Sequence, residues 1–400
     1  MRSTWSFYTA GQLTFGPGAV RQLGEMVSRR RLSRVFVVTD KTLVQLGIAT
    51  RVIEPLRSAG ITMEVFDGGE AEPSISIALA AIEQARGFQP DAILGLGGGS
   101  NMDLSKITAT VLGHGGSPQD YFGFDRVPGP VMPLICVPTT AGTGSEVSHA
   151  AVLTDTENEI KVSTLSNWLR PTLAVVDPEL TYSCPKQVAA DSGIDALTHA
   201  IEGYTATDYR ELATPPGEAC AYEGSFSLGD VIAEKAIRLV GENLVRAVNE
   251  AKNHEARDNM ALASTLAGIA FSNCGVALVH ALEYPMGGAL HCSHGAGNGL
   301  LLPFVMRFNL PERKEKFAKI AELLGVKGSP DIDTMAELAI ESIEQLKRDI
   351  GIPERIRDIG GTEAHLPTFA EKAFAIKRLL WVNPREASLD DLHGILKSAL

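Results

Sequence analysis

The pattern of hydrophobic and polar positions divides the chain into two parts with different periodicity. In the first part, short apolar runs occur at 34–40, 61–68, 91–97 and 133–138. Amphipathic segments separate these runs, for example around 75–87 and from near Asn101 onward. Continuous apolar strands that alternate with helices are typical of a parallel sheet covered on both faces. The pattern therefore predicts an α/β domain with a Rossmann-like parallel sheet.

From about residue 186 the periodicity is mostly helical. Long helices are predicted at 186–206, 229–251, 255–283 and 312–325. Within the last of these, Phe317, Ile320 and Ala321 share one stripe, and the segment ends at a glycine. The periodicity changes in the stretch 175–185. We therefore predict an α/β domain at 1–182 and an all-α domain at 183–400.

Two segments of the second part are unusual in composition. Residues 259–279 carry no charge, which raises the question of a membrane span. Polar side chains such as Ser264, Ser272 and Asn273 dilute this stretch, so we interpret it as a buried core helix. The segment 210–225 is rich in Pro and Gly, which is typical of an irregular insertion.

The charge balance and the cysteines narrow the class of protein. The 400 residues carry a formal net charge of −12, whereas a nucleic-acid binder needs a basic surface. The five cysteines are scattered and form no CxxC pair, which favours a reducing compartment over a disulfide framework. The N-terminal segment has no apolar run of signal-peptide length. These features predict a cytoplasmic protein that binds neither nucleic acid nor a membrane.

A glycine-rich segment, GLGGGSNMDLSK at 95–106, follows a predicted strand and opens a helix. It is not a complete dinucleotide fingerprint, because Ser100 stands where the third glycine is needed. Even so, Gly97, Gly98 and Gly99 lack Cβ atoms, so a phosphate can approach the backbone amides at the helix start. The alternative interpretation is a strand-to-helix turn that needs a positive φ.

A second loop of small polar residues, PTTAGTGSE at 138–146, also follows an apolar strand. Thr139, Thr140, Thr143 and Ser145 offer hydroxyl groups to a phosphate or a ribose. One such loop is usually only a turn, but two at the carboxyl ends of strands indicate a ligand crevice.

Asp40 closes the apolar run RVFVVTD. An acid at the end of a strand in a nucleotide-binding fold accepts hydrogen bonds from ribose hydroxyls and repels a 2′-phosphate, which favours NAD over NADP. The alternative is a helix N-cap, a position that Asp also favours.

Candidate metal ligands begin with Asp195 and His199, which stand four apart in the segment DSGIDALTHAIEGYTA. Residues four apart on a helix share a face, so both side chains can reach one cation. An Asp–His hydrogen bond or a solvated face would explain the pair equally well.

More imidazoles follow in GVALVHALEYPMGGALHCSHGAGNG at 275–299. His280 and His294 would lie about 21 Å apart on one continuous helix. We predict that Pro285, Gly287 and Gly288 break the helix, so that the chain turns back and His280 approaches His294 near His291. One Asp and three His form an oxygen-and-nitrogen set that suits Zn²⁺ or Fe²⁺.

These motifs resemble those of the iron-containing (group III) alcohol dehydrogenase family. GGGSNMD, PTTAGTGSE, DALTHAIE and the VHAL…HG segment occur in the order and approximate spacing of that family. The resemblance implies a nucleotide-binding domain, a helical metal-binding domain and an active site in the cleft between them. It also implies a metal-dependent, NAD-linked alcohol dehydrogenase or aldehyde reductase, which acts on a primary alcohol and forms a homodimer or a higher homo-oligomer.

The resemblance also implies particular site residues. The metal ligands would be Asp195, His199, His280 and His294, with Fe²⁺ as the expected ion and Zn²⁺ as the alternative. Beside Gly97, the expected NAD contacts are Asp40, Gly98, Gly99, Ser100, Asp103, Thr139, Thr140, Thr143 and Lys161.

Two departures from the family pattern affect the expected chemistry. Many members have a histidine near the substrate where this chain has Tyr284, so we assign Tyr284 to the catalytic set as a hydrogen-bonding substitute. The insertion after THAIE, and EYPMGG, resemble the branch of hydroxyacid–oxoacid transhydrogenases. Transhydrogenase activity, a sugar-phosphate cyclase-like lyase that needs NAD and a metal, and a non-catalytic binding protein are the alternatives.

Overall fold

The computed structural model describes residues 2–157, 160–213, 220–328 and 331–400. Contacts between Cα atoms divide the chain into two compact units. The sheet unit comprises Tyr8–Thr140 and Gly144–Ser183. The helical unit comprises Met1–Phe7, Ala141–Thr143 and Cys184–Leu400.

A six-stranded sheet forms the centre of the sheet unit, and every neighbouring pair of its strands is parallel. In spatial order the strands are β1 (Leu13–Phe15), β9 (Leu173–Val176), β6 (Leu134–Pro138), β4 (Ala92–Gly97), β2 (Arg34–Val38) and β3 (Thr62–Phe66). Parallel neighbours need crossover connections, which the helices between the strands provide. The predicted parallel α/β sheet is therefore confirmed.

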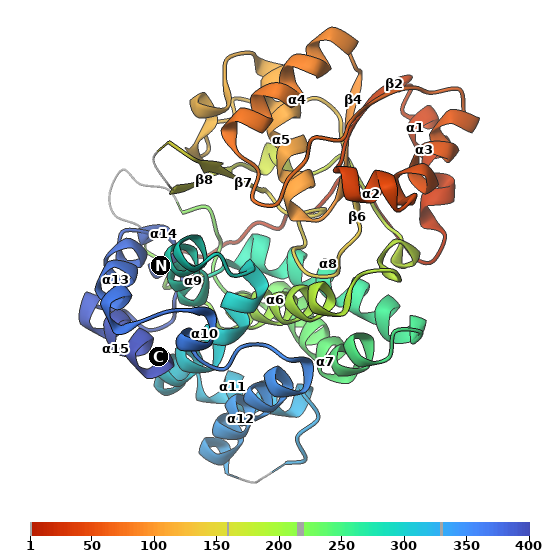
Figure 1. The fold of residues 1–400 in the computed structure, drawn as a ribbon. Coiled ribbons are helices and arrows are strands. Elements are labelled where there is room, and N and C mark those ends of the chain that lie inside the picture. The colour runs from red at the N-terminus through yellow and green to blue at the C-terminus, as the bar shows by residue number, and fades with distance from the viewer. Residues whose placement is uncertain (1, 158–159, 214–219, 329–330) are drawn as a thin grey trace. The chain divides into compact units, whose positions relative to one another are not determined.

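Helices cover both faces of this sheet (Figure 1). One face packs on η1 (Ala19–Gln22), α1 (Leu23–Arg29) and α3 (Ile48–Ser58), and the other packs on α4 (Ile75–Phe88) and α5 (Gly99–His114). Side chains of one strand alternate between the two cores, since Val35 and Val37 join the first and Phe36 and Val38 join the second. Because both faces of the sheet are buried, the strands have continuous apolar sequences.

The chain leaves the carboxyl ends of β2 and β4 in opposite directions along the sheet. After β2 it forms α2 (Lys41–Gln45) and α3 and returns as β3 at the edge, whereas after β4 it forms α5 and returns as β6 on the other side. Ligands of open α/β sheets bind at such a switch point. A smaller sheet of β5 (Gly123–Phe124), β8 (Ile160–Leu165) and β7 (Ala150–Asp155) completes the unit.

The helical unit is built around α6 (Lys186–Thr205), which packs against α7 (Ser227–Asn249), α8 (His254–Cys274) and α10 (His294–Asn309) (Figure 1). Its other helices are α9 (Leu278–Leu290), α11 (Lys314–Leu323), α12 (Ile332–Ile350), α13 (Leu366–Phe374), α14 (Lys377–Leu380) and α15 (Leu389–Ala399). The predicted stripe on α11 is confirmed, because Phe317, Ile320 and Ala321 are buried. Part of the predicted insertion at 210–225, namely 214–219, lies outside the described residues.

The predicted single helix at 255–283 is wrong. α8 ends at Cys274, and α9 begins at Leu278 after Gly275, whose φ of 119° suits glycine alone. A Cβ at Gly275 would also lie 2.5 Å from Cγ1 of Val382. The uncharged stretch is nevertheless a buried part of the core, as predicted. In the described part of the chain no single helix is long and apolar enough to span a membrane. Taken together, α8 and α9 have the necessary length and composition, but the two helices are bent by 107°.

The contact between α1 and α3 gives a test of the sheet unit. A Cβ at Gly24 would lie 2.2 Å from the carbonyl oxygen of Pro55, so we expect Gly24→Ala to destabilise the unit by about 1–3 kcal/mol. Gly87 lies in α4 with open space around its Cβ position, so Gly87→Ala should raise stability by about 0.5–1 kcal/mol. Urea unfolding followed by circular dichroism measures both changes. A wild-type midpoint for Gly24→Ala would contradict the packing of α1 on α3.

Candidate metal centre and dinucleotide site

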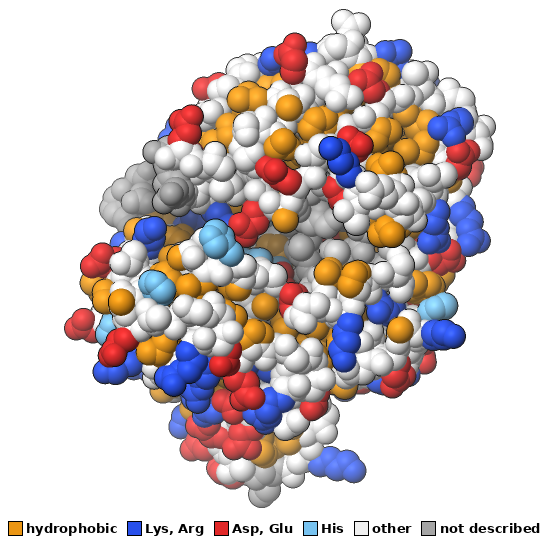
Figure 2. Space-filling model, in the orientation of Figure 1, with side chains coloured by type: hydrophobic (Ala, Val, Ile, Leu, Met, Phe, Trp, Pro, Cys, Tyr) orange, Lys and Arg blue, Asp and Glu red, His pale blue; other side chains and the backbone are white. Residues whose placement is uncertain are grey.

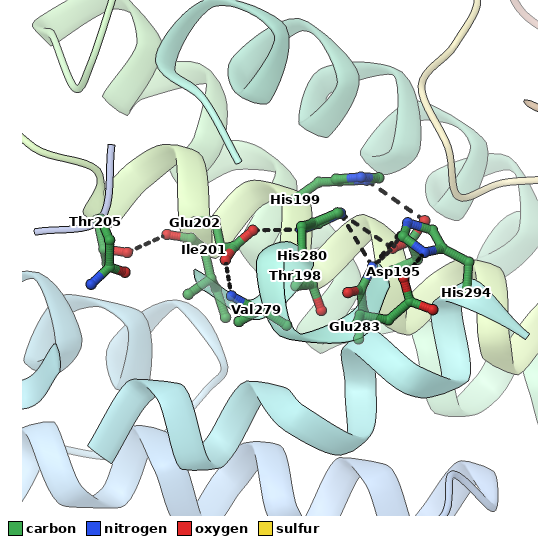
Figure 3. A network of polar contacts seen from close by, with 12 residues as sticks. Asp195, Thr198, His199, Ile201, Glu202, Thr205, Val279, His280, Glu283 and His294 are labelled. Carbon is green, nitrogen blue, oxygen red and sulfur yellow. Dashed lines mark hydrogen bonds and ion pairs between the residues drawn. The ribbon is translucent and has the colours of Figure 1, made fainter. Parts of the chain in front are cut away.

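Three ligand atoms from three helices converge in the helical unit (Figure 3). Asp195 lies on α6, His280 in the first turn of α9 and His294 at the start of α10. Oδ1 of Asp195 is 4.0 Å from Nε2 of His280 and 4.0 Å from Nε2 of His294. All three ligand atoms lie within 4.8 Å of one another, which is close to the span of two metal–ligand bonds of about 2.1 Å each.

The start of α10 is placed beside α6 by a close backbone contact. A Cβ at Gly295 would lie 2.0 Å from the carbonyl oxygen of Asp191, so only glycine fits there. Ser293 caps α10 by accepting from the amide of Ala296, and its hydroxyl donates to Oδ2 of Asp191 at 2.6 Å. Because Asp191 lies one turn before Asp195 on α6, these contacts bring His294 to the carboxylate.

His199 adjoins this group but is not one of the three converging donors. Its ring stacks on Phe271 of α8 and on His280, with centroid distances of 4.2 and 4.8 Å. Its Nδ1 lies 3.8 Å from Oδ2 of Asp195 and 3.3 Å from the carbonyl oxygen of Gly142, within the helical unit. The structure thus brings all four predicted ligands together, and the role of His199 as a ligand stays a prediction.

A buried carboxylate stands behind each of the two converging imidazoles. Oε2 of Glu202 lies 2.5 Å from Nδ1 of His280, and Oε2 of Glu283 lies 2.5 Å from Nδ1 of His294. A carboxylate accepts, so each Nδ1 carries a proton, and Nε2 is the ring nitrogen that faces the centre. Carboxylate–histidine pairs of this kind orient metal-binding imidazoles and raise their basicity.

The sequence analysis assigned no role to either glutamate. Glu202 lies seven residues after Asp195 on α6, and Glu283 lies three after His280 on α9. Residues at these spacings lie on the same face of a helix, so each glutamate could have been identified from its distance along the chain to a candidate ligand. Oε1 of Glu202 also accepts from the amide of Val279 at 2.7 Å, which satisfies a free donor at the start of α9 (Figure 3).

The predicted helix break at Pro285, Gly287 and Gly288 is wrong. All three residues lie inside α9, and the breaks fall before α9, at 275–277, and after it, at 291–293. A proline costs the helix one backbone hydrogen bond, which the burial of α9 outweighs. Gly287 serves packing instead, since a Cβ there would lie 2.1 Å from Oε1 of Glu283.

Asn298, one turn after His294 on α10, also points into the centre. Its Nδ2 donates to Oδ1 of Asp195 at 2.8 Å and lies 3.2 and 3.1 Å from Nε2 of His280 and His294. One donor group thus faces all three candidate ligand atoms. Sequence reasoning missed Asn298, because an amide carries no charge and its partners lie up to 103 residues away.

The burial of the centre and the charges within it shift the pKa values of two of its groups. Burial by itself would raise the pKa of Asp195, but the three imidazoles and the Asn298 amide together hold that pKa below its ordinary value. Burial lowers the pKa of His199 to about 4, against the opposing effect of Asp195. Near neutral pH His199 is therefore an uncharged imidazole with a free lone pair.

Of the two further candidates from the sequence, Tyr284 lies beside the centre. The half-buried ring of Tyr284 lies 6.4 Å from the ring of His280 and 5.9 Å from that of His294, measured between centroids. His291 is exposed and ends α9 in the left-handed conformation, with φ 53°.

The glycine turn of the predicted dinucleotide site lies in the sheet unit. Gly97 has a φ of 143°, and Gly98 precedes Gly99, the first residue of α5. The Cβ position of Gly98 is 3.6 Å from Oγ1 of Thr140, so the glycine turn adjoins the threonine loop. Thr139 is buried and its amide donates to the carbonyl oxygen of Gly97.

Several predicted NAD contacts have partners within the protein. Asp103 accepts from Oγ of Ser145 at 2.8 Å and from the amide of Val152 at 3.0 Å. Nζ of Lys161 lies 2.6 Å from Oε1 of Glu72, whose amide donates to Oγ of Ser100. Asp40 caps α2 by accepting from the amide of Leu43, and Thr143 belongs to the helical unit. Their roles in NAD binding stay predictions.

Two family models match the chain. The model of the iron-containing alcohol dehydrogenase matches residues 10–178, and that of the C-terminal part of the Fe-containing alcohol dehydrogenase family matches residues 189–400. Together they account for both units.

Individual relatives agree over the full length. A 1,3-propanediol dehydrogenase of Klebsiella pneumoniae is 38% identical over 96% of both chains. An NAD-dependent methanol dehydrogenase of Bacillus methanolicus is 34% identical over 99% of this chain and 100% of its own. The crystal structure of a 1,3-propanediol oxidoreductase superposes with a TM-score of 0.93 at 35% identity, over 99% of this chain and 100% of the other. The chain therefore belongs to the iron-containing alcohol dehydrogenase family.

Proposed function

We propose that the chain is a metal-dependent, NAD-linked alcohol dehydrogenase and aldehyde reductase, which transfers a hydride between a small primary alcohol and NAD. The observation that carries this proposal is the convergence of Asp195, His280 and His294, with a carboxylate behind each imidazole. The named activities of the relatives, on 1,3-propanediol and methanol, support the same class of substrate.

The residues of the helical unit would hold a divalent cation through Asp195, His199, His280 and His294. The fit rests on the donor chemistry, because one carboxylate and lone pairs on neutral imidazoles suit both Fe²⁺ and Zn²⁺. The family favours Fe²⁺. When bound, such a cation supplies Lewis acidity, which stabilises negative charge on the substrate oxygen. Glu202 and Glu283 keep the imidazoles oriented and in the competent tautomer.

The residues of the sheet unit would hold NAD, which supplies the hydride acceptor. The amides at the start of α5 point away from the helix and suit a pyrophosphate, while Gly97, Gly98 and Gly99 leave room for it. Ser100, Thr139 and Thr140 offer hydroxyls, and Asp40 would accept from the ribose. Thr143, which belongs to the helical unit, is a further proposed NAD contact. Asp103 and Lys161 complete the proposed set. Tyr284 would hold or move the proton of the substrate hydroxyl.

We further propose a cytoplasmic homodimer or higher homo-oligomer. All five cysteines lie among the described residues and none of them forms a disulfide, which supports a reducing compartment. On the face that Figure 2 shows, acidic and basic side chains are interspersed, which supports a small-molecule substrate over nucleic acid. Size-exclusion chromatography with light scattering tests the oligomeric state.

His280→Ala tests the metal centre. Removing one of the converging donors should lower the iron and zinc content of protein purified without added metal. It should also lower kcat/KM for NADH formation from 1,3-propanediol or methanol by roughly 10³-fold, because several kcal/mol of charge stabilisation are lost. Elemental analysis and absorbance at 340 nm measure the two effects.

The control is His254→Ala, which removes an exposed imidazole at the start of α8. If His280→Ala keeps the activity and the metal content of the wild type, the proposed metal centre is wrong. If the wild type oxidises no alcohol but moves hydride from a hydroxyacid to an oxoacid without added NAD, the transhydrogenase alternative replaces the proposal. Turnover of a phosphorylated sugar acid alone would favour the lyase.

Glu202→Gln tests the carboxylate behind His280. The amide keeps the size of the side chain but removes its charge, so we expect metal affinity to fall about 10–100-fold. Titration of the metal-depleted protein with Fe²⁺ or Zn²⁺ measures the change. Glu234→Gln is the matched control, since Glu234 accepts from Tyr204 in the same unit and contacts no candidate ligand. Equal affinities for both variants would show that Glu202 serves only to cap α9.

Tyr284→Phe removes only a hydroxyl beside the centre. If that group carries the proton, kcat should fall by about 10²-fold while the metal content stays at the wild-type level. Steady-state kinetics in both directions, paired with elemental analysis, make the measurement. A wild-type kcat would assign the proton transfer to solvent.

A further inference from the structure

Asn101 occupies an unusual position at the switch point of the sheet. It lies in the first turn of α5, is buried, and belongs to the glycine-rich segment. Its Nδ2 donates to Oδ2 of Asp40 at 2.8 Å and to the carbonyl oxygen of Leu96 at 3.0 Å. One amide group therefore links Asp40, two residues after β2, to the end of β4.

Two glycines make room for this amide. A Cβ at Gly69, just after β3, would lie 2.1 Å from Oδ1 of Asn101. A Cβ at Gly97, the last residue of β4, would lie 2.3 Å from Nδ2. Both distances are far below a van der Waals contact, so any larger residue at either position would displace the side chain. The ends of three adjacent strands are thus shaped around Asn101.

The contact fixes the orientation of Asp40. One carboxylate oxygen, Oδ1, accepts from the amide of Leu43 on α2 at 3.0 Å, and the other, Oδ2, accepts from Asn101 on α5. Donors from two different helices hold the two oxygens, so the group cannot rotate without losing one of them. Each oxygen keeps a further lone pair, and the side chain is only half-buried, so it can still accept from a ligand.

We propose that Asn101 is a positioning residue that determines the preference for NAD over NADP. This inference rests on the proposed function, in which Asp40 accepts from the ribose of NAD. A carboxylate held in one place accepts from both ribose hydroxyls and opposes a 2′-phosphate. Without Asn101, Asp40 can turn toward solvent, which weakens the bond to the ribose and relieves the repulsion of the phosphate. Asn101 acts through Asp40 and not on the cofactor.

The test compares the dissociation constants of NADH and NADPH, measured by fluorescence titration of the purified protein. We expect Asn101→Ala and Asn101→Leu to lower the ratio of the NADPH constant to the NADH constant by about tenfold, the usual weight of a hydrogen bond to a charged group. The leucine variant fills the space of the amide, so a change shared by both variants cannot come from a cavity alone. Thr108→Val is the matched control, since it removes a buried hydroxyl of α5 that bonds only to Leu104 within the helix.

A double-mutant cycle with Asp40→Asn separates positioning from structure. Asp40→Asn should lower the ratio by itself, and Asn101→Ala in that background should change it no further. An equal loss of affinity for both cofactors in the Asn101 variants would overturn the inference, as would a further change of the ratio in the Asp40→Asn background. If Asp40→Asn leaves the ratio at its wild-type value, the proposed ribose contact fails, and the inference fails with it.

Discussion

The close approach of α10 to α6 is the constraint on which the metal centre depends. Gly295 lies so near the backbone of Asp191 that no side chain fits, and the Ser293–Asp191 hydrogen bond holds the junction. Asp191 lies one turn before Asp195 on α6, so this contact brings His294 and Asn298 of α10 to the Asp195 carboxylate. A small shift at this junction would move His294 and Asn298 on α10. Asp195 and His199, on α6, would stay in place. The centre is therefore a property of helix packing more than of any one motif.

The polar groups at this centre would be costly without mutual compensation. Asp195, Glu202 and Glu283 are buried carboxylates in a unit whose core is otherwise mostly apolar. Buried charge is tolerated when it is paired and hydrogen-bonded. Glu202 and Glu283 receive imidazole N–H groups, and Asp195 receives the Asn298 amide. These hydrogen bonds compensate the three carboxylates from within the unit, and a divalent cation at Asp195, His280 and His294 would add to that compensation.

The sequence predicted the strands and helices whose hydrophobic pattern is visible within one continuous segment. The apolar runs of β2, β3, β4 and β6 and the helices α6, α7 and α11 were found, because each of these elements shows its hydrophobic pattern within one segment. The edge strand β1 and the short β9 were not predicted, since they have only three and four residues. Asp195 and His199 could be paired because they share a helix face. Glu202, Glu283 and Asn298 were missed, because their contacts come from helix packing between distant segments. The misplaced break in α9 has the same origin: Gly287 is required by Glu283, which only the fold reveals.

The two candidate sites follow one structural principle. In each, the group proposed to contact a ligand is oriented by a partner from another element, and a glycine leaves room for that partner. Glu283 stands behind His294 beside Gly287, and Asn101 stands behind Asp40 beside Gly97. An orienting partner limits the rotation of a side chain before a ligand arrives, which reduces the entropy lost on binding. Because neither partner is proposed to touch the ligand, the expected effect of each is on geometry, and it would be measured as metal affinity in one unit and as cofactor preference in the other.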